Sequence, residues 1–196
     1  IKKRIKKIEK NLPDGLSLNI SFDRSTYVKA AIFEIWKTLA IAFVLVTLII
    51  FLFLGNIKSV IVPAVALPVS LIGTFLGLFI FGLSINIFTL LSFILAIGII
   101  TDDSVIMTDA IYQRIEDGQT PLVASFLGAK SITAPIISTT LVLVASFAPL
   151  IFLSGITGTL FRETAIALSF AIVVSSFVAL TLSPALAANF LSKNMK

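Results

Sequence analysis

The chain has 196 residues and a formal net charge of +5; 58% of its residues are hydrophobic and 13% carry a charged side chain. With a mean hydropathy of +1.10, this composition excludes an ordinary water-soluble domain and indicates an integral membrane protein. The sequence contains no Cys and no His, which excludes disulfides and thiolate or imidazole metal sites. We therefore expect no metal and no cofactor, and any proton relay must use carboxylates, hydroxyls or water.

The positive charge is concentrated at the N-terminus, where six of the fifteen Lys and Arg residues lie within the first ten positions. The other basic residues are scattered around apolar segments, so we expect membrane lipid as a partner and no nucleic acid. In the same region Ile1, Ile5, Ile8 and Leu12 recur at helical spacing. After a turn, residues 16–22 alternate between apolar and polar side chains, as a half-buried strand does.

This helix-turn-strand pattern is typical of the end of a soluble α/β subdomain, and a basic helix lying on anionic lipid is the alternative. Because the chain starts at Ile1 inside the expected helix rather than at Met, we expect it to be a piece of a longer protein. We predict that residues 1–35 form the end of this subdomain and a connector, and that residues 36–196 form a membrane bundle. Trp36 lies where an interfacial aromatic side chain is expected.

Five apolar segments follow, each able to cross a hydrocarbon core that is roughly 30 Å thick and takes about 20 helical residues. They are residues 38–54, 59–81, 85–111, 132–153 and 163–186. The sequence therefore predicts an all-α polytopic membrane bundle of five transmembrane helices. In the second segment, the four-residue spacing of Gly73 and Gly77 allows a neighbouring helix to approach closely.

Two adjacent carboxylates, Asp102 and Asp103, lie within the third apolar segment. Each opposes membrane insertion by about 2.5 to 3.5 kcal/mol, so the pair needs a polar cavity or a cationic partner. Intramembrane acids usually mark ion pathways or proton relays, and neighbouring carboxylates disfavour one another's ionisation, which suits proton uptake and release. The alternative is that the span ends at Thr101 and the acids begin a cytoplasmic extension. Against it, residues 105–107 continue the apolar run.

Further polar and small residues accompany this pair. Asp109 lies seven residues after Asp102 on roughly the same helical face, where it could extend a proton path or be a simple interfacial acid. Gly98, one turn before Asp102, leaves room for another helix or for water. The fourth segment carries hydroxyls that could hydrogen-bond to the acids or, as is commoner, to their own backbone. These hydroxyls belong to Ser138, Thr139, Thr140 and Ser146.

The connections between the spans indicate an orientation. We expect residues 112–131 to form an amphiphilic helical segment on the membrane surface and residues 154–162 to form a turn rich in Gly and Thr. An external N-terminal side places five loop Lys and Arg residues inside and three outside, so the positive-inside rule puts the C-terminal end in the cytoplasm. Because no Lys or Arg lies within the five predicted spans, an ionised acid pair needs a cation from another polypeptide segment.

The order of Gly82–Asn86, Leu95–Ile99 and the pair Asp102-Asp103 resembles the fourth transmembrane helix of the resistance-nodulation-division (RND) transporters, especially the acriflavine-resistance type of multidrug efflux pump. The similarity extends in order over nearly the whole chain. It includes residues 52–54, Pro63, residues 68–69, residues 73–75, Gly155, Gly158, Arg162 and residues 182–186.

This resemblance implies a chain of about a thousand residues with twelve transmembrane helices in two repeats, a large periplasmic porter region, and a homotrimer in the bacterial inner membrane. The present chain would be the end of a periplasmic porter subdomain followed by transmembrane helices two to six. The implied activity is antiport of drugs or other amphiphiles against protons, driven by the proton gradient, with the proton relay at Asp102 and Asp103. The relay Lys of the family belongs to the second repeat. A periplasmic adaptor and an outer-membrane channel are further expected partners.

The sequence departs from the family pattern beside the acids. Thr101 and Ser104 stand where the family commonly has Val and Ala, and Asp109 is followed by Ala110 where the family has Glu and then Asn. Because the added hydroxyls could tune the acids, Thr101, Ser104 and Asp109 are candidate accessory residues.

The leading hypothesis is therefore a secondary active transporter and not an enzyme. Two alternatives stay open. One is a non-transporting fragment or the relic of a split gene, and the other is an RND branch that exports lipids or proteins.

Overall fold

The computed structural model of the chain describes residues 24–55, 57–83 and 86–191. The chain divides into two units, residues 1–34 and 35–196. The helix expected over residues 1–12 and the strand expected over residues 16–22 lie outside the described residues. The described part is helical apart from short connections and contains no strand.

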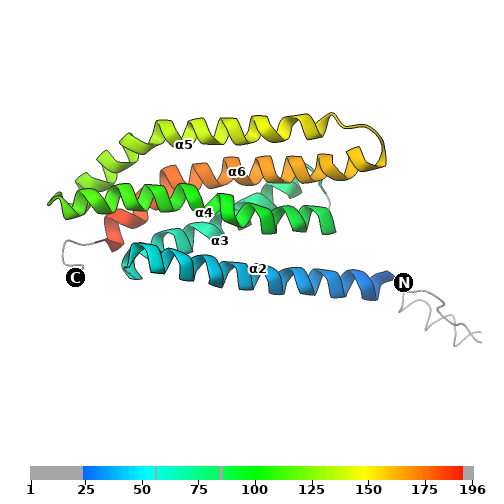
Figure 1. Cartoon of the computed structure of the whole chain (residues 1–196), viewed down its shortest axis with the longest axis horizontal. Coiled ribbons are helices and arrows are strands. Elements are labelled where there is room, and N and C mark those ends of the chain that lie inside the picture. Colours follow the sequence, from blue (N-terminus) through cyan, green and yellow to red (C-terminus); the bar gives the residue numbers. More distant parts are fainter. Residues whose placement is uncertain (1–23, 56, 84–85, 192–196) are drawn as a thin grey trace, which may run out of the picture. The chain divides into compact units, whose positions relative to one another are not determined.

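Five helices make up the described residues, and consecutive helices run in opposite directions (Figure 1). Their bounds are α2 Arg24–Leu54, α3 Ile57–Ile80, α4 Ile87–Glu116, α5 Pro121–Ile151 and α6 Gly155–Phe190. All five are long and apolar enough to cross a membrane. The prediction of five transmembrane helices is therefore confirmed, and the chain is a multi-pass membrane protein.

Several helices extend beyond the predicted apolar spans. The expected turn over residues 154–162 is wrong, because the connection is shorter: α5 ends at Ile151, residues 152–154 form the turn, and α6 already begins at Gly155 with φ +81°. The segment over residues 112–131 is divided between the last turn of α4 and the start of α5, with Gly118 at φ +94° between them. Hydropathy identifies only the residues that lie within the hydrocarbon core. A helix can be longer, because its backbone hydrogen bonds can continue into the membrane interface.

The start of α4 is fixed by Asn86. Its side-chain Oδ1 accepts hydrogen bonds from the backbone N–H groups of Phe88 at 2.9 Å and Thr89 at 3.0 Å. The Thr89 hydroxyl accepts from the Asn86 backbone N–H at 2.9 Å, which completes a capping box. The Asn86 Nδ2 also donates to Glu163 of α6, so the cap joins the beginning of α4 to α6 at a point eight residues after Gly155.

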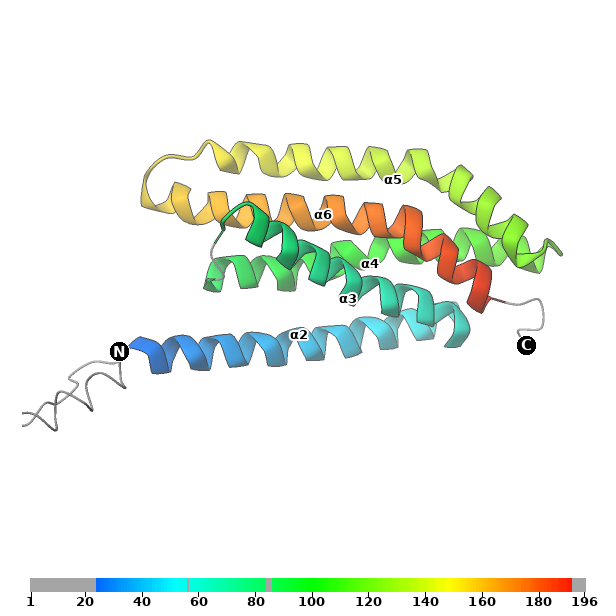
Figure 2. The same ribbon diagram turned by 180° about the vertical axis from the view of Figure 1, so that it is seen from behind.

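Helix α6 is the central element of the bundle and packs against α3, α4 and α5 (Figures 1 and 2). Its buried faces are rich in alanine, a residue that allows close helix approach. These alanines are Ala165, Ala167, Ala171, Ala179 and Ala187, each at most 1% exposed. A polar group on any neighbouring helix is therefore close to the α6 backbone.

The contact of α3 with α6 depends on two glycines. A Cβ atom at Gly73 would lie 2.8 Å from Cγ1 of Val174, and a Cβ atom at Gly77 would overlap the ring of Phe170. This confirms that the Gly73 and Gly77 pair allows close helix packing and identifies α6 as the neighbour.

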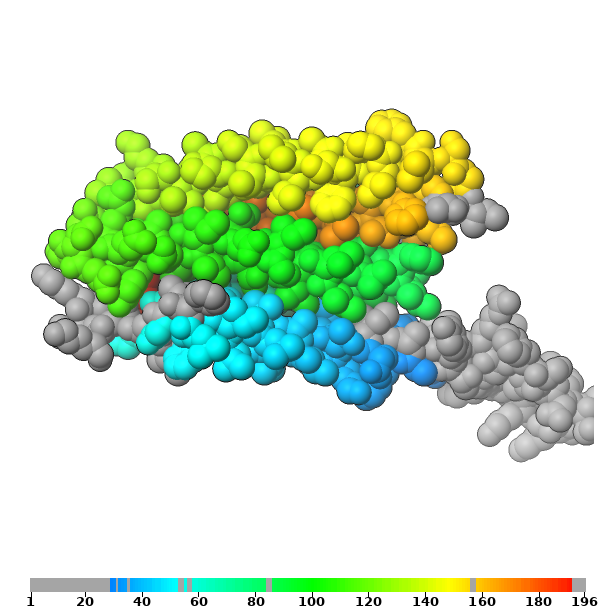
Figure 3. All heavy atoms as spheres, viewed as in Figure 1, coloured from blue at the N-terminus to red at the C-terminus, as the bar shows by residue number. Residues whose placement is uncertain are grey.

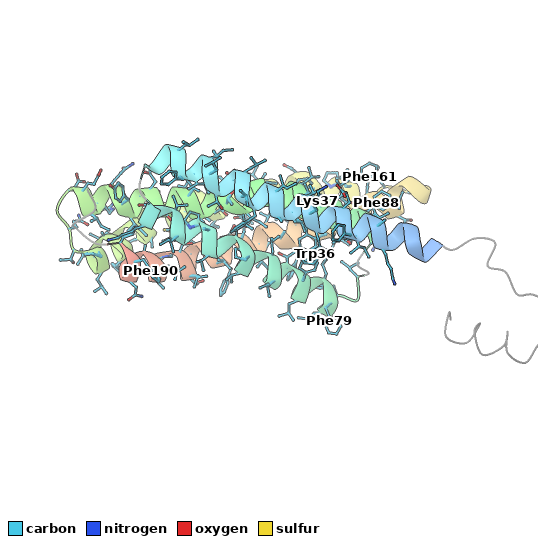
Figure 4. All side chains as sticks on the ribbon, turned by 90° about the horizontal axis from the view of Figure 1, so that it is seen from below. Trp36, Lys37, Phe79, Phe88, Phe161 and Phe190 are labelled. Carbon is cyan, nitrogen blue, oxygen red and sulfur yellow. The ribbon has the colours of Figure 1, made fainter. Side chains whose placement is uncertain are left out.

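The outer surface of the bundle is apolar, as a surface in lipid must be. Phe79 is 82% exposed and Trp36 is 55% exposed. Figure 4 shows Trp36, Phe79, Phe88 and Phe161 toward one end of the bundle and Phe190 toward the other. Aromatic side chains at both ends are typical of the two membrane interfaces.

Candidate functional site

The two acids lie near the midpoint of α4, with about four helical turns on either side of them. Successive residues of a helix point roughly 100° apart, so the two side chains have different surroundings. Asp102 is exposed and Asp103 is half-buried toward α6. Because α4 continues as one helix through the apolar residues 105–107 and on to Glu116, the structure favours a span that includes the acids over the alternative in which the span ends at Thr101.

Asp103 is held by a side chain from α6. The Ser176 hydroxyl donates to Asp103 Oδ2 at 2.8 Å, and Ser176 is only 5% exposed. This serine was missed by sequence reasoning. The available signal was the Ser175-Ser176 pair, because two adjacent hydroxyls are unusual in the middle of an otherwise apolar span and suggest a polar neighbour.

A third helix contributes through Thr140 of α5. Its hydroxyl hydrogen-bonds to the Ser176 hydroxyl, so a continuous polar chain runs from α5 through α6 to the carboxylate on α4. Both alternatives predicted for the fourth-segment hydroxyls are found. Thr140 reaches the acid through Ser176, and the Thr139 and Thr140 hydroxyls also donate to the Ile136 carbonyl at 2.9 and 2.7 Å.

A cavity of about 410 Å³ lies between α4 and α5 beside the acids. Its polar side chains come from both helices, and the rest of its wall is aliphatic. It is lined by Ile99, Asp102, Asp103, Ile106, Ser138, Thr139, Val142 and Leu143. The two carboxylates therefore face a space that also offers hydroxyl groups.

A second cavity of about 410 Å³ lies between α2 and α4. It is lined by Val46, Ile49, Ile50, Gly98, Thr101, Asp102, Val105 and Ile106. Gly98 has open space where its side chain would be, in agreement with the predicted room beside the acids. Asp102 lines both cavities. Figure 3 shows that α4 forms part of the molecular surface beside α5.

The predicted accessory hydroxyls do not contact the acids. The Thr101 hydroxyl donates to the carbonyls of Ile97 and Gly98 at 3.0 and 2.8 Å. Ser104 is buried and accepts from the Ser183 hydroxyl of α6 at 3.3 Å. Both residues adjoin the acids in sequence, but the helix turns their side chains away.

Asp109 is also separate from the pair. It lies two turns after Asp102, roughly 10 Å along the helix, and its Oδ2 accepts from Gln113 Nε2 at 2.8 Å. No described contact joins it to Asp102 or Asp103, so its extension of a proton path stays a prediction.

No described Lys or Arg pairs with either acid, and the side chain that hydrogen-bonds to Asp103 is Ser176. Within the described ranges, no group of three His, Cys, Asp or Glu residues could hold a metal ion.

The chain matches the model of the AcrB/AcrD/AcrF family over residues 1–196. It is 40% identical over 189 residues to an uncharacterized transporter of Haemophilus influenzae, which covers 96% of this chain and 18% of that protein. It is 39% identical over 184 residues to multidrug resistance protein MdtC of Escherichia coli, covering 94% of this chain and 18% of the relative. It is 38% identical over 191 residues to MdtC of Yersinia enterocolitica, covering 97% of this chain and 19% of the relative.

The chain thus spans about a fifth of the length of the curated relatives that it matches. The family match covers every residue, including the acid-bearing helix α4 and its partners α5 and α6. These relatives are RND-type transporters, as the motifs around Asp102 and Asp103 indicated. The chain therefore belongs to the AcrB/AcrD/AcrF family.

Proposed function

We propose that this chain is the part of a proton-driven multidrug efflux pump in which Asp102 and Asp103 take up and release the coupled proton. The observation that carries the proposal is the placement of both carboxylates halfway along a membrane-spanning helix, beside a cavity that also offers hydroxyls. Ionised acids at this depth are costly, so they are retained where their charge is used.

The two carboxylates have different surroundings, which supports different roles. Asp103 is fixed by Ser176, whereas Asp102 lines the cavities on both sides of α4. In the ionised state the pair attracts a cation and water. Once protonated, the pair is neutral and the attraction is lost, so helices that were drawn to the charge can move apart. This change in electrostatic attraction is the proposed link between proton uptake and helix movement.

The cation that pairs with the ionised acids belongs, in this proposal, to another part of the transporter. The resemblance to the family names a relay Lys of the second repeat, and the open space at Gly98 and the exposure of Asp102 suit a helix that approaches α4 there. The proposed whole protein is a homotrimer in the bacterial inner membrane, with the N-terminal part periplasmic and the C-terminal end cytoplasmic. A periplasmic adaptor and an outer-membrane channel complete the export route.

The proposed cargo is a set of amphiphilic small molecules. The printed name of the MdtC relatives, multidrug resistance protein, favours drugs over the lipids or proteins handled by other branches. The cavities described at α4 lie directly beside the acids, so we assign them to protons and water and not to the drug.

The test uses the full-length transporter that contains this segment, expressed in a strain lacking its own efflux pumps. Asp102→Asn and Asp103→Asn each remove the titrating group while preserving the side-chain shape. Each should reduce efflux of a fluorescent lipophilic cation to the level of the strain without transporter, at normal membrane abundance. Asp117→Asn is the control, because Asp117 is an exposed acid in the turn after α4.

Full efflux by both Asp102→Asn and Asp103→Asn would defeat the proposal. The proposal is supported if the two Asn variants also fail to transport when an artificial pH jump of either sign replaces the natural proton gradient. If the wild-type full-length protein exports none of the lipophilic cations tested, the proposed multidrug export fails instead.

A further inference from the structure

The hydroxyls of Ser176 and Thr140 each have more than one hydrogen-bond acceptor within reach but only one proton to donate. Ser176 Oγ is 2.8 Å from Asp103 Oδ2 and 3.0 Å from the Ile172 carbonyl, and it also hydrogen-bonds to the Thr140 hydroxyl. The Thr140 hydroxyl is 2.7 Å from the Ile136 carbonyl. Because a hydroxyl donates only one hydrogen bond, each of them must choose among its acceptors.

The charge on Asp103 decides that choice. An ionised carboxylate only accepts, and hydrogen bonds to it are roughly twice as strong as neutral ones. Ser176 then donates to Asp103, and Thr140 donates to Ser176, so both hydroxyls point toward the charge. Hydrogen bonds aligned in such a chain also strengthen one another.

Protonation of Asp103 can redirect the hydrogen bonds of Ser176 and Thr140. Its new O–H group donates to Ser176 Oγ, Ser176 rotates to donate to the Ile172 carbonyl, and Thr140 donates to the Ile136 carbonyl. The O–H bond forms on the carboxylate with a proton from water in the adjoining cavity, and the hydroxyls only rotate about their C–O bonds. Every polar group has a partner in both states, so neither state carries the penalty of an unpaired buried hydroxyl.

We propose that Ser176 and Thr140 are positioning residues for Asp103: when Asp103 takes up a proton, the hydrogen bond between Asp103 and Ser176 reverses direction, and both hydroxyls turn to donate to backbone carbonyls. This inference rests on the proposed function and adds to it a second helix pair, α5 and α6, that responds to the proton. It also explains why the two acids differ: Asp103 keeps its partner in both states, whereas Asp102 has no described hydrogen-bonding side chain of this kind.

Asp102, the neighbouring acid on α4, is the charged group adjacent to Asp103. The remaining charged side chains of α4, α5 and α6 and of the adjacent α3 are Lys58, Asp109, Arg114, Glu116, Lys130, Arg162 and Glu163. On α5 and α6 the nearest of these lie more than two helical turns from Thr140 and from Ser176.

Ser175 provides a matched control. It is 1% exposed, and its hydroxyl donates to the same Ile172 carbonyl at 3.0 Å without any described contact to an acid. Ser175→Ala therefore removes the same atom from the same helix turn as Ser176→Ala, with similar effects on packing. Only Ser176→Ala removes a partner of Asp103.

The experiment is infrared difference spectroscopy of the purified full-length transporter in bilayers of phosphatidylethanolamine and phosphatidylglycerol, between alkaline and acidic pH. The carbonyl stretch of protonated Asp103 is the band that Asp103→Asn removes. We expect Ser176→Ala to move this band to higher wavenumber, because the protonated carboxyl loses its acceptor. Thr140→Val should move it less, and Ser176→Thr and Ser175→Ala should leave it in place.

Transport measured on the same samples gives a second readout. Ser176→Ala should slow efflux by roughly tenfold, the value of one hydrogen bond to a charged group, and Ser176→Thr should restore the rate. A band that stays in place in Ser176→Ala, or moves equally in Ser175→Ala, overturns the inference while leaving the proton role of Asp103 intact. If no protonated carboxyl band depends on Asp103, the proposed function itself fails.

Discussion

Replacing Gly77 with Val should destabilise the contact between α3 and α6. A Cβ atom at Gly77 would overlap Cε1, Cζ and Cδ1 of the Phe170 ring, the farthest of them at 2.5 Å, whereas carbon atoms in contact lie about 3.5–4.0 Å apart. Phe170 cannot simply rotate away at no cost, because its ring packs edge to face on Phe81 with centroids 5.5 Å apart.

The expected cost is about 1–3 kcal/mol, the usual penalty for inserting extra carbon atoms into a well-packed site. Valine has a higher helix propensity than glycine, which offsets less than 1 kcal/mol of this packing cost. In a long multi-span protein this appears as a lower apparent Tm and not as a two-state free energy. The assay is therefore heating of the detergent-solubilised full-length transporter, with the remaining monodisperse protein measured by size-exclusion chromatography.

Two further variants make the test specific. Phe170→Leu in the Gly77→Val background should recover part of the lost Tm, since residues in contact show coupling of about 0.5–3 kcal/mol. Leu76→Val introduces the same branched side chain at the neighbouring position, which is 60% exposed, and should change the Tm little. A Gly77→Val protein as stable as wild type, or one that Phe170→Leu fails to rescue, would refute the packing argument.

Three other predictions follow from single contacts. Asp109→Asn should retain efflux in the cell assay, because the amide oxygen still accepts from Gln113; loss of efflux would place Asp109 in the proton path. Thr101→Val should also retain efflux, because the Thr101 hydroxyl serves only backbone carbonyls, and a strong loss would show that it acts on the acids. Asn86→Ala should lower the apparent Tm through loss of a cap worth about 0.5–2 kcal/mol and of the contact with Glu163; an unchanged Tm would contradict both roles.

Much of this fold could be predicted from the sequence, because membrane insertion leaves a strong hydropathy signal. Five spans and the depth of Asp102 and Asp103 follow from the apolar runs around them. The glycine pair in α3 was also predictable as a close contact. Its partner was not, because spacing identifies a face of a helix and says nothing about which helix lies against that face.

The surroundings of the acids were harder to predict. Thr101 and Ser104 adjoin the acids in sequence, yet residues next to each other on a helix point in different directions and do not face one another. Ser176 is 73 positions away from Asp103 and meets it only because of how α6 is rotated about its axis. A hydroxyl in a membrane helix usually bonds to its own backbone, so the Ser175-Ser176 pair in the sequence did not reveal that Ser176 meets an acid while Ser175 does not.

The central place of α6 has a consequence for how the protein is made. This helix packs against α3, α4 and α5, yet it leaves the ribosome after all of them. At about 5–20 residues per second, the interval between Asp103 and Ser176 lasts roughly 4–15 s. During that time α4 must remain inserted with its carboxylates deprived of the hydroxyl that later holds one of them. Insertion of α4 therefore has to be stable before its contacts with α6 can form.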